Sequence, residues 1–241
     1  MTGDGRGIGK VLSRALAERG ASVGILGTTG GPVKALADEL NGEGSTAVGI
    51  ACDVADEGQV KAAVDGIAER FGGIDILINN AALHSSEYNK GFTTLGLEKT
   101  RRLFDVNVIG LSICATACRP HMQARGGGVI LNISSIGGYR SDTAYGVSKL
   151  AARGATICLA NELADDNIRV NGVAPGLIAT DQIINDYPAE FLENHVQANQ
   201  KVHRLGQIDD IVQAMLYFCS NRASFVTGET LKVTGGQQLF I

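Results

Sequence analysis

The sequence lacks the features that mark several large classes of protein. It has no run of five charges of one sign, and its formal net charge is only −4 over 241 residues, so we expect no nucleic-acid partner and no charged tail. No apolar run approaches the roughly 20 residues that a membrane helix needs. The start of the sequence also lacks the charged-then-apolar pattern of a signal peptide. These absences predict a soluble, cytoplasmic protein that does not use a membrane as partner.

Ligands for a metal ion and pairs for a disulfide framework are also scarce. The five cysteines are scattered among apolar neighbours, and their odd number argues against paired disulfides. Cys114 and Cys118 stand four residues apart on an expected helix, but no histidine or third cysteine is near them. Small buried side chains are therefore the favoured interpretation. The four histidines, at positions 84, 121, 195 and 203, are dispersed, so we expect no metal site.

What the sequence does contain is an alternation of apolar, β-branched runs with amphipathic stretches, over a length that suits one domain spanning residues 1–241. This alternation predicts an α/β fold, a doubly wound parallel sheet with helices on both faces, in three layers. Asp56 and either Asp142 or Thr143 are expected to cap helices. The expected strands are 21–27, 46–51, 74–79, 128–133, 168–173 and 230–234, and the expected helices are 8–19, 31–41, 57–71, 98–123, 143–164 and 208–220.

One strand of this pattern is missing. The chain opens with MTGDGRGIG, a glycine-rich turn that leads into a helix, although such a turn normally follows a strand. Either the sequence starts several residues late or the sheet has a gap at its centre. Because unpaired backbone groups between two buried strands are costly, the late start is the favoured hypothesis.

The glycine turn also departs from the common dinucleotide pattern GxGxxG, because Lys10 stands where the third glycine would follow Gly5 and Gly7. It reads TGxxxGIG, and this resembles the small single-domain short-chain dehydrogenases/reductases. Further marks of that family follow in order along nearly the whole chain: Asp53-Val54, NNAA at 79–82, Asn107, ISS at 133–135, YGVSK at 145–149, NGVAPG at 171–176 and TGETLKVTGG at 227–236.

The resemblance implies a Rossmann-like fold and an oxidoreductase that interconverts a ketone and a secondary alcohol with a nicotinamide cofactor. Much of the chain is similar to 3-oxoacyl carrier-protein reductases, yet the marks are shared with reductases of other small molecules. The substrate is therefore expected only as a small-molecule carbonyl or alcohol. The implied cofactor-binding residues are Gly3, Arg6, Gly7, Ile8, Gly9, Thr28, Asp53, Val54, Asn80, Ala81, Tyr145, Lys149, Pro175, Gly176, Ile178 and Thr180.

The charge near the glycine turn bears on which dinucleotide is bound. An acidic residue about 20 positions beyond the turn would bind a free ribose 2′-hydroxyl and repel a 2′-phosphate. That region carries no carboxylate, because residues 27–30 read GTTG. Arg6 offers a positive charge and a fork of donors to a phosphate. NADP(H) is therefore preferred, with NAD(H) as the alternative.

The reacting groups are expected on one helix and the strand before it. Tyr145 and Lys149 are four residues apart and share a helix face. A nearby ammonium would lower the pKa of the tyrosine from its usual value of about 10. A bare YxxxK pair is more often an ordinary surface pair, but the resemblance makes Tyr145 the general acid/base and lets Lys149 hold the ribose. It also makes Ser135, rather than Ser134, the residue that orients the substrate oxygen, and it assigns Asn107 to a water relay from Lys149.

Three further points concern the substrate pocket, its lid and the oligomer. Only nine residues separate Ser135 from Tyr145, fewer than the family commonly has, so the resemblance does not predict the pocket wall near Tyr139 and Arg140. The acidic stretch 181–203 resembles the mobile substrate lid of the family. The resemblance also implies a homotetramer or homodimer formed through 98–123 and 143–164. The alternative hypothesis is a catalytically silent dinucleotide-binding or assembly protein, against which the four intact catalytic residues argue.

Overall fold

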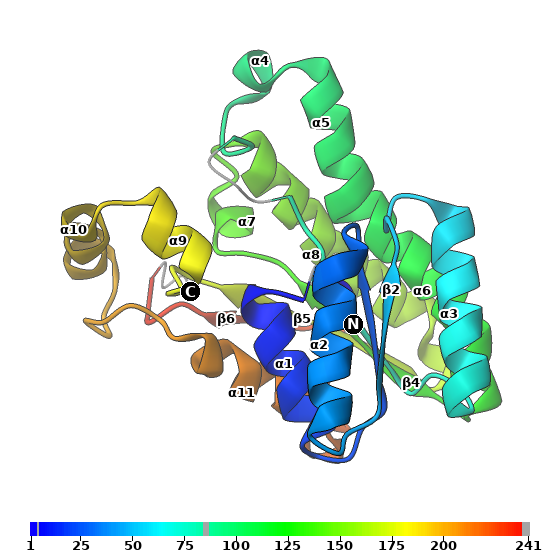
Figure 1. Ribbon diagram of the computed structural model, residues 1–241. Helices are drawn as coiled ribbons and strands as arrows, with labels where there is room; N and C mark the ends of the chain where they lie inside the picture. The colour runs from blue at the N-terminus through cyan, green and yellow to red at the C-terminus, as the bar shows by residue number, and fades with distance from the viewer. Residues whose placement is uncertain (4, 84–86, 238–241) are drawn as a thin grey trace.

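Strands and helices alternate along the computed structural model, which describes residues 1–3, 5–83 and 87–237 (Figure 1). Asp4 of the glycine turn and His84 lie outside the described residues. The strands are β1 (Val23–Gly27), β2 (Ala47–Ala51), β3 (Ile76–Asn79), β4 (Gly128–Ile133), β5 (Ile168–Pro175) and β6 (Thr230–Val233). The longer helices are α1 (Gly7–Ala17), α2 (Gly30–Gly42), α3 (Glu57–Phe71), α5 (Leu97–Phe104), α6 (Gly110–Ala124), α8 (Ala144–Glu162), α10 (Ala189–Asn199) and α11 (Ile208–Cys219).

Shorter helical segments join these elements: α4 (Phe92–Leu95), the π-helical η1 (Asp105–Ile109), α7 (Gly137–Arg140), η2 (Ala164–Asp166), α9 (Asp181–Asp186) and η3 (Asn221–Ala223). In Figure 1, α4 and α5 extend beyond the sheet at the top, and α9 and α10 stand out on the left. Among the described residues, no helix is both long and apolar enough to cross a membrane.

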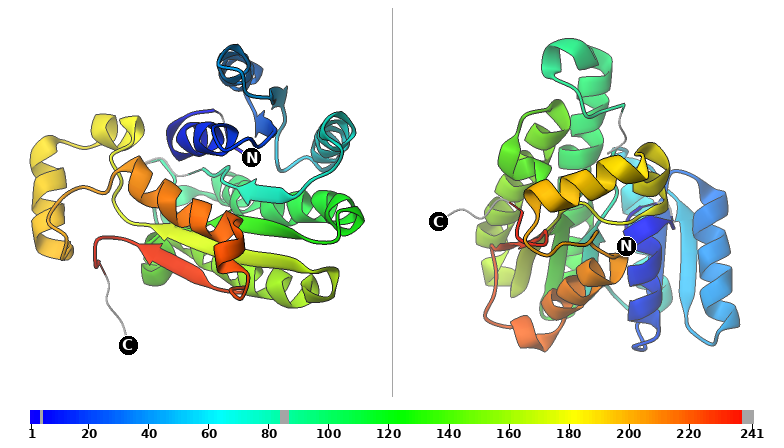
Figure 2. Two further views of the ribbon diagram at one scale, coloured as in Figure 1. Left: turned by 90° about the horizontal axis from the view of Figure 1, so that it is seen from below. Right: turned by 90° about the vertical axis from the view of Figure 1, so that its left-hand side faces the viewer.

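The strands pair in parallel throughout. They form a two-stranded sheet, β1-β2, and a four-stranded sheet in the order β3-β4-β5-β6. The residues that start the chain lie between the two sheets, as the left view of Figure 2 shows. There the Thr2 amide donates to the Ile78 carbonyl at 3.0 Å, and the Gly3 amide donates to the Leu26 carbonyl at 2.8 Å. The expected doubly wound fold without a full first strand is confirmed.

The first three residues of the chain bridge part of the gap in the centre of the sheet. Thr2 pairs with Leu26 near the end of β1, and the Met1 amino group donates to the Gly24 carbonyl at 3.0 Å. Burial lowers the pKa of that amino group. At the opposite end of the gap, a cavity of about 450 Å³ opens beside Leu16, Ile76 and Leu216.

Helices cover both faces of the sheet because consecutive strand residues point to opposite sides. Ile130 of β4 packs into the cluster formed by α3, α6 and α8, whereas its neighbour Leu131 packs against α1 and α11. Leu12 of α1 and Met215 of α11 are fully buried on that second side. A strand buried on both faces reads as a continuous apolar run rather than an alternating one, which is the pattern of GVILNI.

Helix boundaries differ from expectation mainly where the periodicity is interrupted. The expected helix 98–123 is divided by the π-helical turn Asp105–Ile109, and the stretch 181–203 forms two helices rather than one. Asp56 caps α3 as expected, since its side chain accepts from the Gln59 amide. Thr143, and not Asp142, caps α8 by accepting from the Gly146 amide.

Candidate active site and dinucleotide site

Tyr145 lies in the first turn of α8, beside the carboxyl end of β4. The helix starts there because Thr143 is extended and its hydroxyl accepts the Gly146 amide at 3.1 Å. Ser135 follows β4 and lies beside Tyr145, since a Cβ on Gly137 would stand 3.5 Å from the Ser135 Oγ and 3.6 Å from the Tyr145 Cε1. The Ser135 hydroxyl acts to lower the pKa of the phenol. Burial acts in the opposite direction and is the larger cause, so the pKa of Tyr145 is raised overall. The phenol is therefore protonated at neutral pH.

Lys149 lies one turn further along α8 and is buried. Its ammonium donates to the Ile133 carbonyl at 2.8 Å and stands 5.9 Å from the centre of the Tyr145 ring. Burial lowers the pKa of Lys149 to about 8. Tyr145 and Lys149 do share one helix face, but the expected lowering of the Tyr145 pKa is not found. Desolvation of the phenol outweighs its other interactions.

The two serines after β4 have different surroundings. The Ser134 hydroxyl is buried and donates to the Lys149 carbonyl at 2.9 Å, so it is directed into the body of α8. The Ser135 hydroxyl accepts the Gly137 amide at 3.1 Å and retains its proton for Tyr145 or another acceptor. Of the two, Ser135 is thus the serine whose proton is not used in a bond to α8, and its role at the site stays a prediction.

Asn107 lies within the π-helical turn and is buried. Its Oδ1 accepts the Leu83 amide at 2.8 Å, while its Nδ2 donates to the Leu83 carbonyl at 3.1 Å and to the Ser148 hydroxyl at 3.0 Å. Both N–H donors of the Asn107 side chain are thus used in bonds within the protein. The side chain braces the loop after β3, so it does not itself offer a free donor to the expected water relay.

The glycine turn is packed closely against the loop after β3. A Cβ on Gly3 would stand 2.3 Å from the Asn80 Nδ2, and one on Gly9 would stand 2.8 Å from the same atom. Asn80 in turn donates to the Thr2 carbonyl at 3.0 Å, and the Thr2 hydroxyl accepts the amides of Asn80 and Ala81, each at 3.0 Å. The turn can form this way only with glycine at the two contact positions.

The N-terminus of α1 is open for an anion. The helix begins at Gly7, which has a positive φ of 51° and has open space where a Cβ would be. Arg6 stands at the cap position, is exposed, and makes no side-chain capping bond. Helix N-termini with unsatisfied amides bind phosphate groups, so this turn fits the pyrophosphate of a dinucleotide. Ile8 follows inside the helix and packs against the core beside α11.

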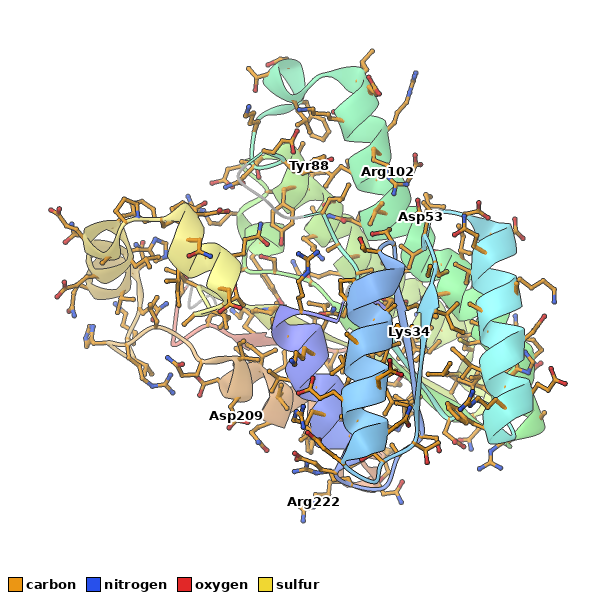
Figure 3. The ribbon with its side chains drawn as sticks, in the orientation of Figure 1. Lys34, Asp53, Tyr88, Arg102, Asp209 and Arg222 are labelled. Atoms are coloured by element: carbon orange, nitrogen blue, oxygen red, sulfur yellow. The ribbon has the colours of Figure 1, made fainter. Side chains whose placement is uncertain are left out.

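The positions expected around the adenosine are brought to the same edge of the sheet. Thr28 follows β1 and is exposed. Asp53 follows β2, where its Oδ1 accepts the Ala55 amide at 3.0 Å and its Oδ2 pairs with Arg102 at 2.7 Å. Figure 3 shows Arg102 and Asp53 facing each other. Val54 is buried and packs on Gly110, where a Cβ would stand 2.8 Å from Val54.

The segment after β5 lies at the other side of the site. Gly176 approaches β6 so closely that a Cβ would stand 2.9 Å from the Thr234 Cα. Pro175 ends the strand, Ile178 is buried, and the Thr180 hydroxyl accepts the Ile183 amide at 3.3 Å as the cap of α9. The Thr180 hydroxyl proton stays available to a ligand.

In the shortened loop between Ser135 and Tyr145, the side chains of Tyr139 and Arg140 have partners other than the reacting groups. The Tyr139 hydroxyl donates to the Thr230 carbonyl at 3.2 Å, and the Arg153 guanidinium lies 3.5 Å from the centre of its ring. Tyr139 therefore packs on β6 and α8. Arg140 forms an ion pair with Asp142 at 2.9 Å.

Comparison with known proteins shows the family to which the chain is similar. A family model described as enoyl-(acyl carrier protein) reductase matches residues 3–238. An uncharacterised oxidoreductase of Mycobacterium tuberculosis is 38% identical over 98% of this chain and 95% of its own length. The 7α-hydroxysteroid dehydrogenase of Escherichia coli is 35% identical over 98% of this chain and 92% of its own length.

The chain belongs to the short-chain dehydrogenase/reductase family. Membership places it among nicotinamide-dependent oxidoreductases that interconvert alcohols and ketones. The similarity to 3-oxoacyl carrier-protein reductases is confirmed by the enzyme of Aquifex aeolicus, which is 33% identical over 98% of this chain and 95% of its own length. The cis-4-hydroxycyclohexanecarboxylate dehydrogenase of Sinomonas cyclohexanicum is 34% identical over 98% of this chain and 94% of its own length.

The solved structure of a family member superposes on this short-chain dehydrogenase/reductase along nearly its whole length. It is a 7α-hydroxysteroid dehydrogenase complexed with NADH and 7-oxo glycochenodeoxycholic acid. The TM-score is 0.90 with 34% identity, over 99% of this chain and 94% of the other. The fold expected from the sequence is thus shared with a solved relative.

Two residues at the site of this short-chain dehydrogenase/reductase escaped the sequence analysis. Thr2 anchors the loop after β3, and Ser148 joins Asn107 to α8. Each stood inside a quoted motif, TGxxxGIG or YGVSK, but its role depends on a partner far away in the sequence. Within the described ranges, no group of three or more histidine, cysteine or acidic side chains could hold a metal ion.

Proposed function

We propose that this chain interconverts a ketone and a secondary alcohol by hydride transfer, with NADP(H) as the preferred cofactor and Tyr145 as general acid/base. The observation that carries the proposal is the placing of the Ser135 hydroxyl next to the Tyr145 ring, with the buried ammonium of Lys149 5.9 Å from the centre of that ring. A proton donor, an oxygen-orienting hydroxyl and a positive charge meet at the carboxyl edge of the sheet. Ligands of parallel α/β sheets bind along that edge.

In ketone reduction the protein must place the carbonyl and supply a proton. The Ser135 hydroxyl donates to the carbonyl oxygen and holds it next to the phenol. Tyr145 then gives its proton to that oxygen as the alkoxide forms, and alcohol oxidation reverses the transfer. The raised pKa keeps the phenol protonated at neutral pH, which suits the reductive direction. The dinucleotide, when bound, supplies or accepts the hydride.

Residues on both sides of the cleft would hold the dinucleotide. The glycine turn with Gly3, Gly7 and Gly9 takes the pyrophosphate, and Lys149 holds the nicotinamide ribose. The backbone near Ile178 and the Thr180 hydroxyl take the carboxamide, with Pro175 and Gly176 shaping the turn. Asp53 and Val54 would hold the adenine, and each Asp53 oxygen keeps a lone pair beyond its bond to Ala55 or Arg102.

The preference for NADP(H) rests on the charges beside the glycine turn. Residues 27–30 carry no carboxylate that would repel a 2′-phosphate. Arg6 is exposed at the start of α1, and its neighbour Gly5 lies against the start of α2, where a Cβ on Gly5 would stand 3.1 Å from the Pro32 carbonyl oxygen. A guanidinium there offers charge-assisted hydrogen bonds to a phosphate.

We propose an alicyclic alcohol or ketone as the substrate. The named substrates of two relatives carry their hydroxyl on a saturated ring, in a steroid and in a cyclohexanecarboxylate. Beside Tyr145 this chain has an apolar cluster around Leu95, Leu103 and Ala144, into which Leu83, Tyr88 and Phe104 pack. An apolar wall of this kind favours a ring over a charged chain.

We also propose that residues 1–241 form one domain of a cytoplasmic homotetramer or homodimer. Leu150 and Ile157 of α8 are exposed by 44% and 54%, and Ile109 before α6 by 51%. An interface between copies of the chain would cover such exposed apolar side chains on α8 and at the start of α6. Light scattering of the purified protein measures the number of copies directly.

The proposed activity is tested by following NADPH absorbance with a panel of cyclic and open-chain ketones. We expect oxidation of NADPH with at least one cyclic ketone and weaker activity with open-chain ones. Binding of NADPH without oxidation by any ketone would instead support a silent binding or assembly protein.

A further inference from the structure

Ser148 is a buried serine between the two reacting residues of α8. Its side chain is fully inaccessible to solvent. The hydroxyl donates to the Tyr145 carbonyl at 2.7 Å and accepts from the Asn107 Nδ2 at 3.0 Å. A helical serine that bonds back to a carbonyl of the preceding turn often bends the helix there, so this bond acts on the geometry of the turn that carries Tyr145.

The same network reaches the loop after β3 through Asn107. The Asn107 Oδ1 accepts the Leu83 N–H at 2.8 Å, and the Asn107 Nδ2 donates to the Leu83 carbonyl at 3.1 Å. Leu83, Asn107, Ser148 and Tyr145 thus form one chain of hydrogen bonds. It joins a loop that follows Ala81 to the first turn of the helix that carries the phenol.

The π-helical turn explains how Asn107 reaches both partners. In this turn the Gly110 amide bonds to the Asp105 carbonyl, five residues back. The extra residue shifts the register of the helix, so Asn107 points into the interior at 3% exposure. Such turns are rare and are found mostly at functional sites.

We infer that Ser148 is a positioning residue that sets the place of Tyr145 relative to the loop after β3. This inference rests on the proposed function, since it concerns the residue that transfers the proton. Without the hydroxyl, the buried Nδ2 of Asn107 loses one acceptor and the first turn of α8 loses its tie to that loop. The phenol then shifts relative to Ser135, while the glycine turn that would hold the pyrophosphate stays in place.

The test compares Ser148→Ala with Ser13→Ala. Ser13 is also a fully buried helical serine, but its hydroxyl has no partner within the described part of the chain. Small misplacements of reacting groups cost up to about a hundredfold in rate, so we expect kcat of Ser148→Ala to fall by roughly ten- to a hundredfold. The KM for NADPH should stay within about twofold, and Ser13→Ala should match the wild type in both constants.

Hydrogen exchange gives a readout that does not require turnover. The Leu83 amide donates to Asn107, so its exchange should quicken in Ser148→Ala and not in Ser13→Ala. The double variant Asn107→Ala/Ser148→Ala should lose no more kcat than Asn107→Ala alone, because both act through one network. Should Ser148→Ala fail to fold, Asn107→Asp serves instead, since it keeps the acceptor for the Leu83 amide and removes the Nδ2 that donates to Ser148 and to the Leu83 carbonyl.

The outcomes separate the inference from the proposed function. Unchanged kcat together with unchanged Leu83 exchange in Ser148→Ala would overturn the inference. So would a loss of kcat that Ser13→Ala shares, or additive losses in the double variant. If the wild type turns over no ketone, the proposed function fails, and Leu83 exchange alone then decides whether the network couples the loop to α8.

Discussion

The Lys149 ammonium nitrogen lies 2.8 Å from the Ile133 carbonyl oxygen, and the side chain is 3% exposed. One neutral acceptor compensates a buried charge only in part. Burial accordingly lowers the pKa of Lys149 to about 8 from a usual value of 10.5. The protein therefore carries a destabilising group at the site where the proposed reaction needs it.

Lys149→Met should stabilise the free protein while abolishing activity. A shift from 10.5 to about 8 corresponds to roughly 3 kcal/mol of unfolding free energy. Below pH 8 both states of the wild type bind the proton, so the cost of burial is complete. Between about pH 8 and 10.5 the unfolded state binds more protons, so wild-type stability rises with pH and the advantage of the variant shrinks. Urea unfolding of both proteins at pH 7, 8.5 and 10 measures the difference in their unfolding free energies. A variant less stable than the wild type at pH 7 would refute this prediction.

Arg6→Ala should weaken NADPH binding by roughly ten- to a hundredfold, since hydrogen bonds to charged groups contribute about 1.5–3 kcal/mol. NADH binding should change by less than about twofold, because NADH has no 2′-phosphate. Fluorescence titration measures both dissociation constants. Arg19→Ala, two residues beyond the other end of the same helix, is the matched control and should leave both constants unchanged. Equal weakening of both cofactors by Arg6→Ala would remove the basis for an NADP(H) preference.

An apolar extension of five β-branched residues before Met1 should stabilise the protein. It would pair with the exposed backbone edges of β1 and β3 and cover Ile76, and it would replace the buried amino group that now bonds to Gly24. Each kcal/mol raises Tm by about 2–4 °C in a chain of this size, so we expect a rise of several degrees. An extension of five glycines and serines is the control. Equal Tm values for the two extensions would show that the gap does not accept a strand.

The strands could be predicted from sequence because local signals surround them. GVILNI follows a glycine turn, and its expected limits at 128–133 are those found. The helices were harder where the pattern breaks. Nothing in the periodicity of 98–123 marks the extra residue of the π-helical turn at Asp105–Ile109. Four-residue helices such as α7 are too short to show any period.

The site was predicted in its parts but not in its connections. Tyr145 and Lys149 share a helix face, as a spacing of four requires. The acceptor of Lys149 is a backbone carbonyl on another element, and Asn107 bonds to Leu83 across 24 positions. The raised pKa of Tyr145 follows from tertiary burial, which spacing does not reveal. Contacts of this kind depend on the packed fold and leave no local pattern.

The most direct test of the central claim is the rate of NADPH oxidation by Tyr145→Phe with a ketone that the wild type reduces. Removing the phenol hydroxyl leaves the ring in place, so Tm and the NADPH dissociation constant should stay close to those of the wild type. General acid catalysis contributes about 10²–10⁴ in rate, and we predict a loss of kcat in that range. A Tyr145→Phe variant that binds NADPH and reduces the ketone at the wild-type rate would contradict the account.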